Sequence, residues 1–212
     1  PFIPSLEAGM AAARAAGLRL PVVWNCSGYE LPETVERLAG FVDIFLPDLK
    51  LLNPELSGRL FAAVDYPERA TSAIKQMAEL RPGSIIRHLV LPGLLHETRR
   101  VLEWFAGEVK DRALLSLMVQ FAVPEPAPDR AWRRGVSALE NRPLTTGEYD
   151  LLLRWLDELD IDEGFIQEPG DEEVWWPDFG RHNPFPPEHS KVVWSWTEGY
   201  AGPITDPTKW RS

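Results

Sequence analysis

Two patterns of hydrophobic and polar residues, one typical of helices and one typical of strands, alternate along the first 168 residues of this chain. Segments with apolar residues three and four positions apart predict amphipathic helices, and short continuous apolar runs between them predict buried strands. Thr145 and Glu148 have the spacing of a capping box, which predicts a helix start. The expected helices cover residues 6–17, 32–38, 67–80, 97–109 and 145–159, and the expected strands cover residues 20–24, 42–50, 85–91, 114–121 and 164–167.

This regular alternation of helix and strand predicts an α/β fold with right-handed βαβ units and a parallel sheet. Five strands are too few to close an eight-stranded barrel. A partial parallel (β/α) barrel with its first strands missing is therefore expected. Loops are expected through Asn53 and Pro54 and over the proline-rich residues 124–129.

The composition changes after residue 168, which predicts two parts: a partial barrel over residues 1–168 and an irregular Trp/Pro-rich extension over residues 169–212. Neither a helical nor a strand period persists in the second part. So much aromatic surface is unusual in a disordered tail, so the extension is expected to lie against the barrel or to meet a partner. Its tryptophans are Trp175, Trp176, Trp194, Trp196 and Trp210.

Charge and cysteine content narrow the possible function classes. The formal net charge of -10 argues against a nucleic-acid surface, which needs a basic face. The single cysteine, Cys26, allows no internal disulfide and fits a reducing, cytoplasmic compartment. No apolar run approaches the roughly 18 residues of a membrane helix, so no membrane association is expected.

Polar side chains stand at the ends of the expected strands. Asp48 and Lys50 are two positions apart, so they share one face of their strand. The carboxyl ends of parallel strands are where such folds bind ligands. Two basic groups and one acid around a cavity suit an anionic or zwitterionic ligand, although a structural ion pair is the alternative. The residues at these ends are Asn25, Ser27, Asp48, Lys50, Arg87, His88, Gln120 and Gln167.

Some of these positions are ambiguous from sequence alone. Arg87 and His88 are neighbours on one strand, so only one of them can face the interior, and parity does not decide which. Cys26 is either a small structural residue or a reactive thiol, and the first is favoured. The histidines have no metal-ligand spacing, so no histidine zinc site is expected. A hydrolase is also not expected, because Ser27-Gly28 lacks the flanking glycines of a nucleophile elbow.

Four motifs in this order resemble the radical S-adenosylmethionine proteins, and most of all an uncharacterised branch similar to pyruvate formate-lyase activating enzyme. The resemblance covers about residues 1–168. Its motifs are residues 20–30 (LPVVWNCSGYE), 43–50 (DIFLPDLK), 86–93 (IRHLVLPG) and 117–121 (LMVQF).

The resemblance implies a partial barrel of the TIM type, a 4Fe-4S cluster and S-adenosylmethionine. Reductive cleavage of S-adenosylmethionine would give a 5′-deoxyadenosyl radical for hydrogen abstraction. The implied partners are a substrate, which could be a glycyl-radical protein, and an electron donor such as flavodoxin or ferredoxin.

The resemblance also implies which residues line the S-adenosylmethionine pocket. Asp48, Lys50, Arg87 and Gln120 stand at the matching motif positions, with Gln120 where the activating enzymes have histidine. Residues 25–28 (NCSG) stand where those enzymes have an Asp-Thr-Asn-Gly turn beside a monovalent cation, so Asn25 and Ser27 join the implied pocket.

The family binds its cluster through a CxxxCxxC motif, which this sequence lacks. The expectation is an N-terminally incomplete piece of a radical enzyme that is inactive alone, with the cluster ligands in a preceding segment. One alternative is a degenerate, non-catalytic half-barrel that serves as a binding or scaffold module. Another is a Schiff-base lyase built on Lys50.

Overall fold

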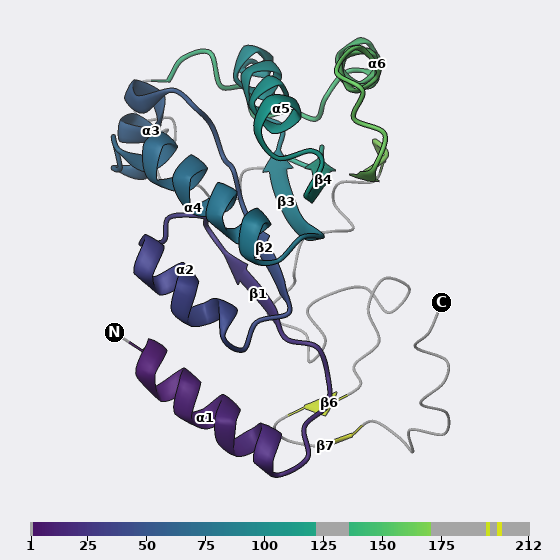
Figure 1. Ribbon diagram of the computed structural model, residues 1–212. Helices are drawn as coiled ribbons and strands as arrows, with labels where there is room; N and C mark the ends of the chain where they lie inside the picture. The colour runs from purple at the N-terminus through teal and green to yellow at the C-terminus, as the bar shows by residue number, and fades with distance from the viewer. Residues whose placement is uncertain (1, 122–135, 171–193, 196–198, 201–212) are drawn as a thin grey trace. The chain divides into compact units, whose positions relative to one another are not determined.

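The computed structural model describes residues 2–121, 136–170, 194–195 and 199–200. The chain forms two compact units, Pro1–Pro169 and Gly170–Ser212. The first unit alternates helices and strands along the chain (Figure 1), as the sequence pattern predicts. Its elements are α1 (Ile3–Ala15), β1 (Val23–Cys26), α2 (Pro32–Ala39), β2 (Ile44–Pro47), α3 (Pro54–Phe61), α4 (Tyr66–Leu80), β3 (Ser84–Leu89), α5 (Leu95–Glu108), β4 (Ala113–Met118), α6 (Thr146–Glu158) and β5 (Gly164–Ile166).

All described strand pairs of the first unit are parallel, and strands that are neighbours in space are neighbours in sequence. β1 pairs with β2, and β3, β4 and β5 form a three-stranded sheet in that order. A single parallel bridge between Asp48 and Arg87 joins the two groups. The described strands thus follow one another in the order of a (β/α) barrel, and they form an open sheet rather than a closed one.

The break between β2 and β3 has a cause in the sequence. The Phe45 N–H donates to the Ser84 side-chain oxygen at 3.3 Å, and the Leu49 N–H donates to the Arg87 carbonyl at 2.8 Å. Pro47 lies between these two donors on the same edge of β2 and has no N–H to offer. The ladder between the two strands is therefore reduced to a bridge at residue 48.

The two faces of the sheet differ in burial. Phe45, Ile86 and Leu115 are fully covered by the helices, together with Ile74 of α4. The alternate residues of β2, β3 and β4 are only half-buried. This alternation settles the ambiguity at β3: His88 faces the helix layer and is 2% exposed, while the neighbouring Arg87 faces the open side.

The largest error in the expected elements is α3, which was predicted as loop through Asn53 and Pro54. The Asn53 side chain accepts hydrogen bonds from the N–H groups of Glu55 (2.9 Å) and Leu56 (3.1 Å), and Pro54 takes the first helical position. An Asn-Pro pair followed by an acidic residue is a helix-start signal that competes with its turn interpretation. The capping box of Thr145 is confirmed at α6.

Strand bounds also shift. The strand expected over residues 20–24 begins at Val23 and runs to Cys26, so Asn25 lies in the strand rather than in the following turn. Its register is set by the pairing of Val23 with Ile44 and by the Val22 N–H, which donates to Asp43 Oδ2 at 2.7 Å. Tertiary pairing, rather than the apolar run itself, fixes these ends.

The second unit contains a short antiparallel pair, β6 (Trp194–Ser195) and β7 (Gly199–Tyr200), where no strand was expected. The other four tryptophans of the extension lie outside the described residues, and so does the loop predicted over residues 124–129. The division into a partial barrel over residues 1–168 and an irregular extension over residues 169–212 remains a prediction.

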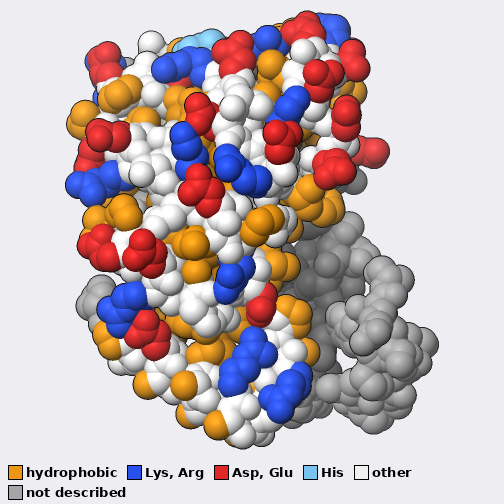
Figure 2. Space-filling model, viewed as in Figure 1, with side chains coloured by type: hydrophobic (Ala, Val, Ile, Leu, Met, Phe, Trp, Pro, Cys, Tyr) orange, Lys and Arg blue, Asp and Glu red, His pale blue; other side chains and the backbone are white. Residues whose placement is uncertain are grey.

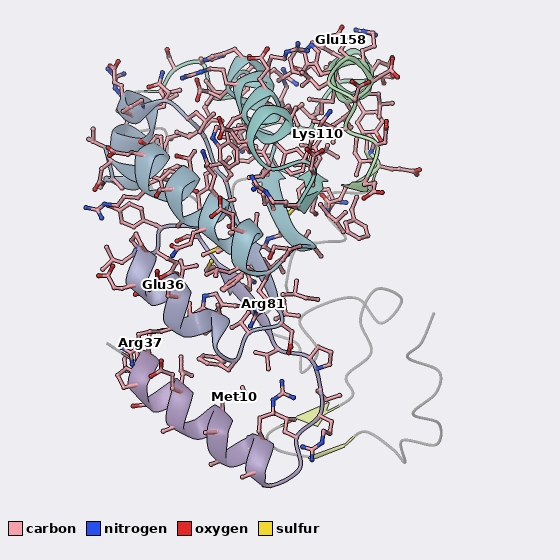
Figure 3. All side chains as sticks on the ribbon, viewed as in Figure 1. Met10, Glu36, Arg37, Arg81, Lys110 and Glu158 are labelled. Atoms are coloured by element: carbon pink, nitrogen blue, oxygen red, sulfur yellow. The ribbon has the colours of Figure 1, made fainter. Side chains whose placement is uncertain are left out.

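Acidic and basic side chains are interspersed over the helices on the face shown in Figure 2. Ion pairs join neighbouring helices: Arg37 of α2 pairs with Glu7 of α1, and Glu158 of α6 pairs with Arg99 of α5 at 2.7 Å (Figure 3). Such exposed pairs contribute little stability individually. In the part of the chain that is described, no helix is both long and apolar enough to cross a membrane.

Candidate functional site

Three adjacent strands bring four of the predicted residues together on the open face of the sheet. Asn25 comes from β1, Asp48 and Lys50 follow β2 directly, and Arg87 comes from β3. Arg87 Nε donates to Asp48 Oδ1 at 2.9 Å, and Arg87 Nη2 donates to Asn25 Oδ1 at 2.7 Å. Lys50 Nζ donates to the other oxygen, Asp48 Oδ2, at 2.8 Å. We call these four residues the strand-end cluster.

The strand-end cluster is accessible and keeps unused donors. Its charged side chains are 21% (Asp48), 26% (Arg87) and 36% (Lys50) exposed. Within the described residues, the Lys50 ammonium donates only to Asp48, and Arg87 Nη1 has no partner. One carboxylate between two cations leaves a net positive charge with open N–H donors, which suits a ligand that carries a carboxylate beside an ammonium.

The turn after β1 lies against the backbone of the cluster. Gly28 has a φ of +76°, and a Cβ at this position would stand 2.7 Å from the Asp48 carbonyl oxygen. Only glycine accommodates both the left-handed conformation and this close approach. The Ser27 carbonyl oxygen lies 3.0 Å from the Tyr66 hydroxyl, and the Ser27 side chain accepts from the Tyr29 N–H at 3.5 Å. Ser27 therefore borders the cluster without a side-chain bond to it.

Tyr66 is a site residue that the sequence did not reveal. Its hydroxyl, from the first turn of α4, lies 2.8 Å from the Asp48 carbonyl oxygen and accepts from the Lys50 N–H at 3.0 Å. The ring is 3% exposed, and burial raises the pKa of its phenol, so the hydroxyl keeps its proton. A tyrosine before a proline at a helix start carries no recognisable motif, so only the fold could identify it.

His88 approaches the same backbone from the helix side. Its Nδ1 lies 2.8 Å from the Leu49 carbonyl oxygen and its Nε2 lies 3.0 Å from Thr98 Oγ1. A carbonyl only accepts, so Nδ1 carries the proton and Nε2 accepts from the threonine hydroxyl. Burial lowers the pKa of His88 to about 4, which keeps the imidazole neutral.

Gln120 does not join the strand-end cluster. It follows β4, and its half-buried side chain makes no hydrogen bond to the rest of the described chain. Gln167 has a clear structural contact instead, because its Oε1 accepts from the Val119 N–H at 3.1 Å and ties the end of β5 to β4.

Cys26 lies on the helix side of β1, packed beside the cluster of buried residues that includes Phe45 and Val35. Burial raises the pKa of its thiol to about 11, so the thiol is protonated at neutral pH. This environment supports the structural interpretation of Cys26.

Lys50 lacks the surroundings of a Schiff-base lysine. Such an amine is activated in an apolar pocket or beside another cation, whereas Lys50 is bound to a carboxylate and partly exposed. The geometry therefore favours binding over imine chemistry.

The residues present do not fit an iron–sulfur cluster. A 4Fe-4S cluster needs several thiolates, and the sequence has one cysteine, which faces the helices. Among the described residues, no group of three His, Cys, Asp or Glu side chains could hold a metal ion.

Comparisons with known proteins agree with the fold. No family model matches the sequence. The chain is 34% identical over 104 residues to an uncharacterised protein of Methanocaldococcus jannaschii; the match covers 48% of this chain and 30% of that protein. The structure resembles a domain of pyruvate-formate lyase-activating enzyme from Bacteroides vulgatus, with a TM-score of 0.57, 13% sequence identity and coverage of 79% of this chain and 92% of that domain.

At this identity the structural likeness shows the fold: a parallel α/β arrangement like that of an activating-enzyme domain. The chain spans less than a third of the length of its curated relative. The activity, substrates and partners of a whole protein therefore belong to the proposals that follow.

Proposed function

We propose that this chain is the S-adenosylmethionine-binding part of a radical S-adenosylmethionine protein related to the glycyl-radical activating enzymes. The observation that carries the proposal is the strand-end cluster, in which one carboxylate and two cations meet at the carboxyl ends of adjacent parallel strands. Such ends are the usual ligand sites of parallel folds. The likeness to an activating-enzyme domain supports the same assignment at the level of fold.

Each member of the cluster has a distinct part in binding. Asp48 receives the ligand's ammonium, and Lys50 with the open Nη1 of Arg87 receives its carboxylate. Asn25 holds the guanidinium of Arg87 through its side-chain oxygen. Ser27 and Gln120 are proposed at the margin of the same ligand site, beyond these direct contacts.

Bound S-adenosylmethionine would supply a sulfonium whose reductive cleavage yields the 5′-deoxyadenosyl radical. That step needs a 4Fe-4S cluster, for which this chain has no thiolate set, so only the binding of the amino-acid end is derived from its residues. A glycyl-radical protein as substrate, and flavodoxin or ferredoxin as electron donor, remain predictions from the resemblance.

The test is calorimetric titration of the full chain with S-adenosylmethionine. Lys50→Gln removes one cation, and the expected result is about tenfold weaker binding, equal to ~1.4 kcal/mol. The matched control is Lys75→Gln on α4, whose ammonium pairs with Glu108 of α5. This control should bind as the unsubstituted chain does.

A second ligand separates the amino-acid end from the nucleoside. Adenosine lacks the carboxylate and ammonium, so Lys50→Gln should not weaken its binding. The proposal fails if the unsubstituted chain gives no saturable binding of S-adenosylmethionine, or if Lys50→Gln and Lys75→Gln bind it equally well.

A further inference from the structure

We propose that Tyr66 and His88 are positioning residues that fix the backbone of residues 48–50, so that Asp48 and Lys50 present their charges to the same side. The claim about ligand affinity rests on the proposed function. The claim about the backbone concerns the protein alone and is tested separately.

The backbone bonds of residues 48–50 come from two kinds of partner. Strand backbone satisfies two of them: the Asp48 N–H donates to the Cys26 carbonyl at 3.0 Å, and the Leu49 N–H donates to the Arg87 carbonyl at 2.8 Å. Side chains satisfy three others: the carbonyls of Asp48 and Leu49 and the N–H of Lys50. Those side chains are Tyr66 and His88.

Side chains are needed here because the ladder has ended. β2 stops at Pro47, which cannot donate, and the bridge to β3 is a single residue pair. Buried backbone groups without partners are costly, so another source of hydrogen bonds must replace the ladder. Tyr66 and His88 supply it from opposite sides of the strand, one from α4 and the other from β3.

The Tyr66 hydroxyl is suited to bridging. It accepts from the Lys50 N–H and has one proton to donate, with the carbonyls of Asp48 (2.8 Å) and Ser27 (3.0 Å) both in reach. Its ring is held between aromatic neighbours: Tyr29 stacks on it with ring centroids 5.9 Å apart, and Phe61 meets it edge-on at 5.7 Å. The hydroxyl is thus held at a fixed place.

His88 supplies the remaining side-chain hydrogen bond, because its imidazole links the Leu49 carbonyl to Thr98 of α5. The Leu49 carbonyl belongs to the peptide plane that precedes Lys50, so His88 fixes that plane. The plane that follows Asp48 is fixed by Tyr66 at the Asp48 carbonyl and by the Leu49 N–H bond to Arg87. Alternation along the strand then points both side chains away from the buried Leu49.

The primary test is Tyr66→Phe, which removes the bridging hydroxyl and keeps the ring and its aromatic contacts. The matched control is Ser84→Ala, which also removes a buried hydroxyl that bonds two backbone groups, the Phe45 N–H (3.3 Å) and the Arg81 carbonyl (2.7 Å), at the start of β3. Both variants lose one buried bridge, so their global stabilities should fall comparably.

The ligand-independent measurement is amide hydrogen exchange of Lys50 in the full chain, with Ile86 as an internal reference. Tyr66→Phe should speed the Lys50 exchange about tenfold or more relative to Ile86, since its acceptor is gone, and Ser84→Ala should not. Equal Lys50 exchange in the two variants would overturn the proposal whether or not a ligand binds.

The second measurement is the affinity for S-adenosylmethionine. Tyr66→Phe should bind it about fivefold or more weakly than Ser84→Ala does. Unchanged affinity in Tyr66→Phe would refute a positioning role while the proposed function stands. If the unsubstituted chain does not bind the ligand, the proposed function fails, and the Lys50 exchange alone decides whether Tyr66 holds this backbone.

A conservative pair of variants tests His88 in the same way. The side-chain amide of Asn can replace the Nδ1–H donor toward the Leu49 carbonyl, whereas Leu cannot. His88→Asn should therefore retain most of the Lys50 protection and ligand affinity that His88→Leu loses. Equal behaviour of the two variants would remove His88 from the proposal and leave a packing role.

Discussion

The buried His88 predicts a specific dependence of stability on pH. Its pKa is about 4 in the folded protein, against 6.5 for an ordinary histidine. Between pH 6.5 and about 4, His88 is therefore protonated in the unfolded chain and neutral in the folded protein. The free energy of unfolding must therefore fall as pH drops from 6.5 to about 4, and this contribution stops changing below 4, where both states are protonated.

The magnitude follows from the same two values. The gap between 6.5 and about 4 corresponds to a loss of about 3 kcal/mol of stability. The main cause is burial: His88 is 2% exposed, and both ring nitrogens already have partners in Leu49 and Thr98. The hydrogen bond to Leu49 and the charges of Glu97 and Asp48 act in the opposite direction, and burial outweighs them.

The assay is urea unfolding followed by circular dichroism at several values between pH 4 and pH 7.5. His88→Asn removes the titrating group and keeps a donor toward Leu49, so its unfolding free energy should lose about 3 kcal/mol less over this range than that of the unsubstituted chain. His96→Asn is the control, because His96 lies in the first turn of α5 and its side chain is 62% exposed.

Carboxylates titrate in every variant, so the comparison uses the difference between pH profiles rather than any single value. The reasoning is refuted if His88→Asn and His96→Asn have the same pH profile as the unsubstituted chain. It is also refuted if the profile of His96→Asn is the flatter of the two.

Three other predictions follow from particular contacts. Gly28→Ala should lower the free energy of unfolding by about 3 kcal/mol in urea titrations, because it combines a positive φ with a Cβ 2.7 Å from the Asp48 carbonyl oxygen; Gly107→Ala, in the open on α5, should not destabilise. Glu148→Gln should cost about 1–2 kcal/mol at pH 7, because hydrogen bonds from Arg142 lower the pKa of Glu148 to about 2, and this difference should vanish as pH falls from 4.5 towards 2. Phe105→Ala, at a fully buried position, should cost about 3–5 kcal/mol by thermal or urea unfolding, and a cost below about 1 kcal/mol would contradict its place in the core.

The sequence by itself determined the succession of elements and part of the site. Apolar periodicity is a local property, so it predicted the helices and strands of residues 1–168, with the exception of α3. The spacing of Asp48 and Lys50 placed both on one side of their strand, and the structure has them bonded to each other at 2.8 Å. The capping box of Thr145 was likewise readable because it involves residues three apart.

Only the tertiary structure decided which strand face is open. Parity separates Arg87 from His88, but the helices that cover β3 determine that His88 is buried and that Arg87 reaches Asp48 and Asn25. Tyr66 lies outside every motif. Its hydroxyl can bond to the backbone of residues 48–50 only because α4 packs beside the end of β2, where the regular ladder of strand hydrogen bonds ends at Pro47. Hydrogen bonds between residues far apart in sequence depend on how the elements pack, and no local pattern encodes them.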